Sequence, residues 1–156
     1  TSTDHAHPSL LSSTHSVTCG AAPLGPSLLS RFLDKFGPDL CFQEGYGMTE
    51  ASPLTHLSPP HRCVIGSCGT AVPNTLTKLV DLLTGETLDP KGKEGELCVK
   101  GPQVMKGYYR NEAATRDMLC PEGWLRTGDI ARVDEEGNVF IVDRLKELIK
   151  VKGLQV

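Results

Sequence analysis

The chain has 156 residues, a net charge of −3 and 38% hydrophobic residues. A domain holds about 150 residues, so this length allows one compact unit or a piece of a larger protein and excludes a large multidomain enzyme. The 16 Lys and Arg residues do not exceed the 19 Asp and Glu residues, which excludes the basic surplus that nucleic acids or anionic membranes attract. No apolar run approaches the roughly 20 residues of a transmembrane helix, so we expect a soluble protein.

The two ends of the chain indicate a piece of a longer intracellular protein. Residues 1–7 lack the basic and apolar segments of a secretory signal, and an apolar and basic pattern stops at Val156 without a polar tail. The cysteines have no C-x-x-C spacing, which favours reduced core thiols. A metal site remains an alternative, with two candidate sets that both lack further ligands: His61, Cys63 and Cys68, or His5 and His7.

A strand–helix–strand unit is predicted over residues 15–43. Residues 15–19 are typical of a short strand, Pro26 is suited to the first turn of a helix, and an apolar stripe at helical spacing ends at Gly37. Residues 40–43 fit a second strand. Such units build parallel sheets whose ligands gather beyond the carboxyl ends of the strands, so a binding site is predicted after Gln43.

From about residue 60 the pattern changes to short strands separated by turns. One short helix is predicted over residues 112–119, and a hairpin turn over residues 134–138. Strands are predicted at residues 76–81, 96–100, 124–126, 130–133 and 139–142. The fold class is therefore mixed α/β, with the strand–helix–strand end of a layered α/β subdomain followed by a small distorted β-barrel.

The hexapeptide Gly45-Tyr46-Gly47-Met48-Thr49-Glu50 is the segment that offers most chemistry. Its glycines allow close approach of the backbone to a ligand. Tyr46 offers a flat face for a base, Thr49 a hydroxyl for a phosphate oxygen, and Glu50 a hard oxygen for Mg²⁺. A nucleotide needs all three contacts, although a plain turn with a core tyrosine and an exposed glutamate has the same composition.

This hexapeptide resembles the adenine- and phosphate-binding motif of the adenylate-forming superfamily of acyl-CoA synthetases, 4-coumarate:CoA ligases and firefly-type luciferases. Four ordered motifs are far more specific than one. The resemblance covers nearly everything after about residue 10. The three further motifs, in the order of the family, are residues 20–24, 123–129 and 143–153, and the intervening residues 95–102 and 105–109 also resemble the family.

The resemblance implies an ATP-dependent carboxylic acid:CoA ligase of the AMP-forming type, acting on a fatty or aryl acid. A carboxylate attacks the α-phosphorus of ATP to give an acyl-adenylate, and the thiol of coenzyme A then takes the acyl group. ATP or AMP, Mg²⁺ and coenzyme A are the implied ligands. Both steps relocate negative charge and so depend on positioned cations and donors. Leu54 and Thr55, which follow the hexapeptide, are candidates for the acyl pocket.

The resemblance also implies roles for single residues. Tyr46 would stack on the adenine, and Asp129 would accept hydrogen bonds from both ribose hydroxyls. Arg144 would reach the ribose or a phosphate, Thr49 would contact the α-phosphate, and Glu50 would hold Mg²⁺. The nucleotide-binding set in full is Gly20, Ala21, Ala22, Gly45, Tyr46, Gly47, Met48, Thr49, Asp129 and Arg144.

Residues 143–153 resemble the family hinge, about which a small carboxy-terminal domain rotates between the two steps. Lys146 matches the pivot. Lys150 and Gln155 match catalytic positions, and Gly153 matches the coenzyme A channel, whereas basic residues on a flexible linker are the alternative interpretation. The implied division is residues 1–59 for the α/β subdomain, 60–143 for the β-barrel subdomain, and 144–156 for the hinge and the start of a carboxy-terminal domain.

Two elements of the family have no counterpart in this sequence: the Ser/Thr/Gly-rich phosphate loop with its lysine, and the carboxy-terminal domain with the adenylation lysine. The first cradles phosphates and the second offsets developing negative charge. We therefore expect a fragment that is inactive alone. A luciferase-like monooxygenase fragment and a noncatalytic nucleotide-binding or interaction module stay open, and the expected location is cytoplasmic or peroxisomal.

Overall fold

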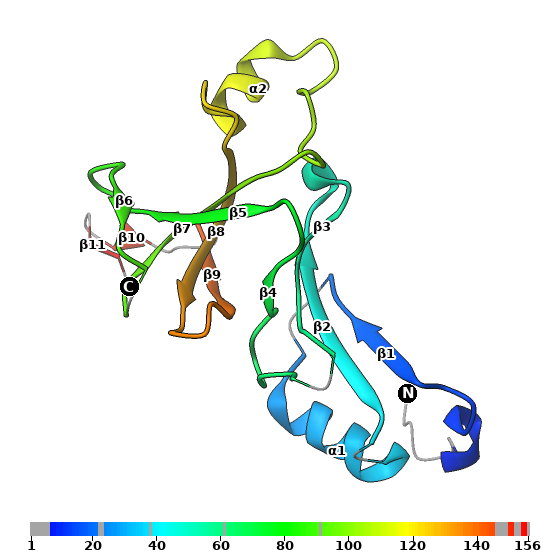
Figure 1. Ribbon diagram of the computed structural model, residues 1–156. Coiled ribbons are helices and arrows are strands. Elements are labelled where there is room, and N and C mark those ends of the chain that lie inside the picture. The colour runs from blue at the N-terminus through cyan, green and yellow to red at the C-terminus, as the bar shows by residue number, and fades with distance from the viewer. Residues whose placement is uncertain are drawn as a thin grey trace.

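Two β-sheets organise the protein in the computed structural model (Figure 1). One has four strands in the order β1-β2-β3-β4, and the other has five in the order β6-β5-β7-β8-β9. This architecture confirms the predicted mixed α/β class. The structure describes residues 7–21, 24–37, 39–60, 62–90, 92–145, 150–151 and 154–155.

The first sheet contains the predicted strand–helix–strand unit. β1 (Ser16–Cys19) pairs in parallel with β2 (Cys41–Gly47), and α1 (Pro26–Phe36) connects them. The helix begins at Pro26, which needs no hydrogen-bond acceptor there, and packs on the sheet with Leu29 buried. The rings of Phe32 and Phe42 lie 5.8 Å apart across this contact, so apolar burial holds α1 on the sheet.

The other two strands of this sheet were not predicted. After β2 and the 3-10 turn η3 (Thr49–Ala51), β3 (Leu54–Leu57) returns antiparallel to β2, and β4 (Thr70–Ala71) pairs with β3. Ser52 makes the reversal in the left-handed region, with φ of 58°. These strands are short and lie beside prolines, which gives them no strong local signal. The 3-10 turn η2 (Pro8–Leu11) precedes β1.

The second sheet is antiparallel throughout. Its strands are β5 (Leu76–Val80), β6 (Thr87–Leu88), β7 (Glu94–Lys100), β8 (Leu125–Val133) and β9 (Val139–Arg144). The two strands predicted around Trp124 and Ile130 form the single strand β8. A closed barrel needs pairing between its end strands, and among the described residues β6 and β9 do not pair. The predicted barrel is therefore an open sheet in the described part of the chain.

Two smaller elements complete the chain. The predicted helix α2 (Glu112–Met118) begins after Asn111, whose side chain accepts a hydrogen bond from the Ala114 backbone at 3.1 Å. The short strands β10 (Lys150–Val151) and β11 (Leu154–Gln155) pair with each other. Among the described residues, no helix is both long and apolar enough to cross a membrane.

The core of the second sheet extends to the hexapeptide of the first. Ala51 of η3 is fully buried in this core, and Tyr46 and Met48 pack against it. The turn after β2 is therefore held by side chains of the second sheet. The buried core residues are Ala51, Leu79, Leu97, Val99, Leu125, Ala131 and Val139.

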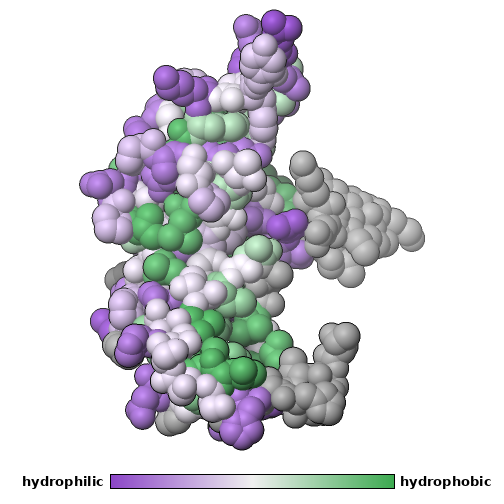
Figure 2. Space-filling view, turned by 90° about the vertical axis from the view of Figure 1, so that its right-hand side faces the viewer, coloured by the Kyte–Doolittle hydropathy of each residue, from purple (hydrophilic) through white to green (hydrophobic). Residues whose placement is uncertain are grey.

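Some apolar surface remains uncovered. Figure 2 shows hydrophobic surface gathered in the lower part of the molecule, at the level of α1 in Figure 1. Leu28 of α1 is 50% exposed. Tyr109 and Leu83 are more exposed still, at 85% and 96%.

A buried histidine connects the two sheets. His56 of β3 has no exposed surface, and its Nε2 lies 3.0 Å from the hydroxyl of Thr77 on β5. Its Nδ1 lies 3.0 Å from the hydroxyl of Thr55. Burial lowers the pKa of His56 to about 4 from its usual 6.5, because the charged imidazolium would lose its hydration.

This shift predicts acid sensitivity of folding. Unfolded chains bind a proton at His56 near pH 6.5 and the folded chain only near pH 4, so stability falls as pH drops from 6.5 towards 4. Titration of His56 should therefore lower the free energy of unfolding by about 2 kcal/mol between pH 7.5 and pH 5. Urea unfolding at both pH values measures it, with His56→Asn as the control that lacks this titration. Equal pH dependence in the two proteins would contradict the prediction.

Candidate functional site

Two of the predicted motifs, residues 20–24 and the hexapeptide of residues 45–50, meet at the carboxyl ends of β1 and β2. Cys19 at the end of β1 is the register partner of Glu44, so the loop that begins at Gly20 lies beside Gly45. A Cβ atom on Gly20 would lie 2.9 Å from the carbonyl oxygen of Gly45, which is too close for any residue except glycine. Gly20 and Ala21 are exposed, and Ala22 lies outside the described residues.

The hexapeptide forms the end of β2 and the turn after it. The Met48 backbone N–H donates to the carbonyl oxygen of Pro53 at 2.8 Å, and a Cβ atom on Gly47 would overlap the same carbonyl group. This close backbone crossing requires glycine at position 47. Thr49, the first residue of η3, is exposed, and Glu50 is half-buried.

Three predicted site residues from distant parts of the chain are in contact. The Tyr46 hydroxyl donates to Oδ2 of Asp129 at 2.6 Å, and Nε of Arg144 lies 3.3 Å from Oδ1 of the same carboxylate. Asp129 on β8 is 8% exposed, and Arg144 is its register partner on β9. Burial and the bond to Asp129 raise the pKa of Tyr46, so the phenol stays a donor at neutral pH.

The strand segment that carries Asp129 is held by buried polar groups. The Thr127 hydroxyl donates to the Leu97 carbonyl at 2.7 Å and accepts from the Asp129 backbone at 3.1 Å. Glu96, which is 2% exposed, accepts from Nε of Arg126 at 2.9 Å. The carboxylate of Asp129 therefore has a fixed position at the contact between the sheets.

Glu50 is also held by a partner that the sequence did not single out. The Tyr108 hydroxyl donates to Oε1 of Glu50 at 2.6 Å, and the Met105 backbone donates to the Glu50 carbonyl at 2.7 Å. The bond to Glu50 raises the pKa of Tyr108. Tyr108 and Met105 both lie in residues 105–109. The resemblance of that segment to the family was the sequence signal that could have pointed to these two partners of Glu50.

A carboxylate to which the sequence analysis gave no role lies at the strand ends. Glu44 is 8% exposed, and its Oε1 accepts from the Leu24 backbone at 3.3 Å. Its Oε2 has no hydrogen-bond partner within the described part of the chain. Burial raises the pKa of this carboxyl group, because desolvation disfavours the charged form.

The proposed acyl-pocket residues differ in access to solvent. Leu54 is 38% exposed, whereas Thr55 is completely buried and its hydroxyl donates to the Tyr46 carbonyl at 3.2 Å. Thr55 therefore contacts the hexapeptide from inside the protein.

The structure describes the hinge segment only in part. Lys150 and Gln155 are backbone partners in the β10–β11 pair, and their side chains are not described. Lys146 and Gly153 lie outside the described residues.

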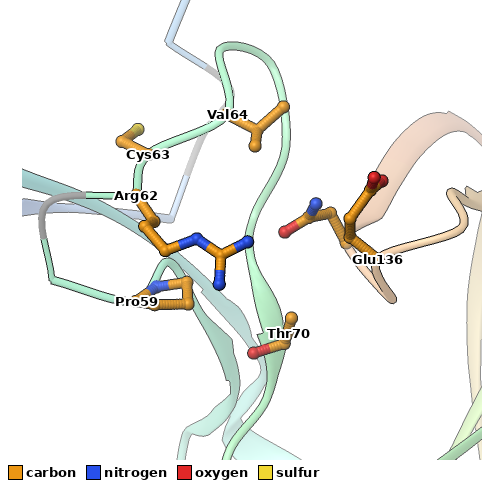
Figure 3. Close-up of a pocket in the computed structure, with 7 residues that line it drawn as sticks. Pro59, Arg62, Cys63, Val64, Thr70 and Glu136 are labelled. Carbon is orange, nitrogen blue, oxygen red and sulfur yellow. The ribbon is translucent and has the colours of Figure 1, made fainter.

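Two cavities lie away from the contacts of Tyr46 and Asp129. One, of about 520 Å³, is lined by residues of β7 and the segments flanking α2. The other, of about 210 Å³, lies between the 59–70 loop and the turn after β8. Figure 3 shows Arg62 extending into this space and the Glu136 carboxylate turned away from it. No residue of the predicted nucleotide-binding set lines either cavity.

The metal alternative gains no support within the described residues, which contain no cluster of three or more His, Cys, Asp and Glu side chains able to hold a metal ion. His5 and His61 lie outside these residues. The cysteines, all of which are described, are free thiols: Cys19, Cys41, Cys63, Cys68, Cys98 and Cys120.

Comparison with known proteins gives consistent matches over most of the chain. The 4-coumarate–CoA ligase 2 of Nicotiana tabacum is 48% identical over 151 residues, which cover 94% of this chain and 28% of that protein. ATP-bound MatB from Rhodopseudomonas palustris is 34% identical with a TM-score of 0.79, covering 89% of this chain and 27% of that structure. The luciferase-like enzyme of the nonluminescent mealworm Zophobas morio is 32% identical with a TM-score of 0.81, covering 94% and 35%.

The chain spans about a quarter of the length of the curated relatives it matches, between 26% and 28%. The sequence profile of the family described as AMP-binding enzyme matches residues 2–109, which include the hexapeptide and the segments around Gly20 and Tyr108. The chain belongs to this family of AMP-binding enzymes.

Proposed function

We propose that this chain carries the adenosine-binding part of an ATP-dependent carboxylic acid:CoA ligase of the AMP-forming type. The observation that carries the proposal is the contact of Tyr46 with Asp129 at 2.6 Å. The exposed residues Gly20 and Ala21 begin the loop beside Gly45, the chain neighbour of Tyr46. An aromatic face and a fixed carboxylate suit a base and a ribose, respectively. Similarity to the ATP-bound MatB structure supports the assignment.

The charges around Asp129 fit this role. The carboxylate accepts from Tyr46 on one oxygen and faces Arg144 across the strand pair at the other. Each carboxylate oxygen has a further lone pair for a ribose hydroxyl. The Arg144 side chain is 64% exposed, so it can turn from Asp129 to a phosphate without a large desolvation cost.

Glu50 would hold Mg²⁺, which neutralises phosphate charge when it is bound. Tyr108 occupies Oε1 and thereby orients Oε2, as partners of metal-ligating carboxylates do. The exposed Thr49 hydroxyl lies one residue before Glu50 and would contact the α-phosphate.

The relatives favour a ligase over a light-emitting enzyme. The 4-coumarate–CoA ligases are 44% to 49% identical to this chain, and the luciferase-like enzyme that it resembles at 32% identity comes from a nonluminescent mealworm. We propose an aryl or fatty acid as the substrate and coenzyme A as the acceptor. The roles of Lys146, Lys150, Gly153 and Gln155, and the division at residues 59 and 143, belong to the same proposal.

AMP titration of the 156-residue chain tests the adenosine site. Stacking of a base on an aromatic side chain contributes about 1–3 kcal/mol, so Tyr46→Ala should weaken AMP binding at least about fivefold. Tyr46→Phe should weaken it less, because the ring remains. Tyr109→Ala, at an 85% exposed tyrosine, is the matched control. Unchanged AMP affinity in Tyr46→Ala would reject the site.

The Mg²⁺ assignment is tested by Mn²⁺ binding in the presence of ATP, followed by electron paramagnetic resonance. Glu50→Gln should abolish the protein's contribution to Mn²⁺ affinity. Tyr108→Phe should reduce the affinity about tenfold, as loss of a partner of a metal ligand does, and Tyr109→Phe should have no effect. Equal Mn²⁺ affinity in Glu50→Gln and the unchanged protein would refute the role of Glu50.

Carboxylate-dependent release of pyrophosphate by the 156-residue chain measures whether it acts alone. We expect no turnover, because these residues include no phosphate loop and match only about a quarter of the full-length relatives. Sustained turnover would overturn this expectation.

A further inference from the structure

A line of hydrogen bonds through the buried side chains of His56 and Thr55 runs from the second sheet to the hexapeptide. The Thr77 hydroxyl lies 3.0 Å from Nε2 of His56, and the Thr55 hydroxyl lies 3.0 Å from Nδ1. The Thr55 hydroxyl also contacts the Tyr46 carbonyl oxygen at 3.2 Å. His56 and Thr55 have no exposed surface, whereas Tyr46 and Thr77 at the two ends of the line are partly exposed, so the bond between Thr55 and His56 is fully buried.

The direction of every bond in this line follows from the donors available. A carbonyl oxygen only accepts hydrogen bonds, so the Thr55 hydroxyl donates its single proton to the Tyr46 carbonyl oxygen. The Thr55 oxygen must then accept from Nδ1 of His56, which therefore carries the proton. A neutral imidazole has one N–H, so Nε2 accepts from the Thr77 hydroxyl. The burial that lowers the pKa of His56 keeps the ring neutral at pH 7.

The line ends at an irregular point of the sheet. The β2–β3 register shifts between Tyr46 and Gly47, so regular ladder bonds do not fix the backbone there. Tyr46 and His56 are register partners, and their ring centroids lie 5.9 Å apart. Three contacts thus hold Tyr46. Its hydroxyl donates a hydrogen bond to Asp129, its ring packs on the ring of His56, and its carbonyl oxygen accepts a hydrogen bond from Thr55.

We propose that His56 is a positioning residue for adenine recognition: its Nδ1–H, acting through Thr55, holds Tyr46 in the orientation that stacks on the base. Thr77 orients the imidazole and ties this position to the second sheet. The inference rests on the proposed adenosine site and adds a residue that does not touch the nucleotide.

Two substitutions at position 56 distinguish a hydrogen-bonding role of His56 in positioning Tyr46 from a role of its side chain in packing alone. The side-chain amide of His56→Asn places a donor where Nδ1 stands, and that of His56→Gln reaches the position of Nε2 instead. Calorimetric titration with AMP should give an affinity for His56→Asn within about twofold of the unchanged protein. His56→Gln and Thr55→Val, which lack the donor or the hydroxyl, should bind AMP about 3- to 10-fold more weakly, the cost of one hydrogen bond.

Urea unfolding of each variant supplies the stability control. Equal losses of AMP affinity in His56→Asn and His56→Gln, or losses that follow stability alone, would overturn the positioning role. If the unchanged protein binds no AMP, the proposed adenosine site itself fails, and the inference fails with it.

The tautomer can be measured without any nucleotide. Long-range ¹H–¹⁵N correlation spectra should show a protonated Nδ1 and an unprotonated Nε2 for His56, assigned by the loss of its signals in His56→Asn. A proton on Nε2 would overturn the inference even if AMP binds, which distinguishes its failure from failure of the proposed function.

Discussion

The hydrogen bond between Tyr46 and Asp129 is the contact on which the arrangement of this site depends. It joins β2 of one sheet to β8 of the other, across 83 residues of sequence. Hydrogen bonds to charged groups contribute about 1.5–3 kcal/mol, and this one also sets the distance between the aromatic ring and the carboxylate. A nucleotide that used both groups would meet a geometry already formed, which lowers the cost of ordering on binding.

Buried polar groups, together with a shared apolar core, hold the two sheets together behind this contact. The bond between His56 and Thr77 joins the two sheets, and within the second sheet Glu96 with Arg126 fixes the strand before Asp129. Such groups are costly when unpaired and directional when paired. A purely apolar contact would tolerate small shifts between the sheets, whereas these bonds define one register.

Several relations were predictable from local sequence. Pro26, the apolar stripe of α1 and Gly37 set the helix bounds, and the strand–helix–strand order predicted the parallel pairing of β1 with β2. The hexapeptide and the segment ending at Asp129 identified the family that the comparisons then showed. The strands β3 and β4 and the open second sheet were not predicted, because short pairing and closure depend on neighbours distant in sequence.

The sequence by itself determined the local elements and the chemistry available, since periodicity, turn residues and motifs act over a few neighbouring residues. Only the tertiary structure decided which groups meet. It brought Tyr108 to Glu50, buried Thr55 against the hexapeptide, and left Glu44 buried with one oxygen unpartnered among the described residues. Contacts of this kind depend on packing between sheets, and no spacing along the chain encodes them.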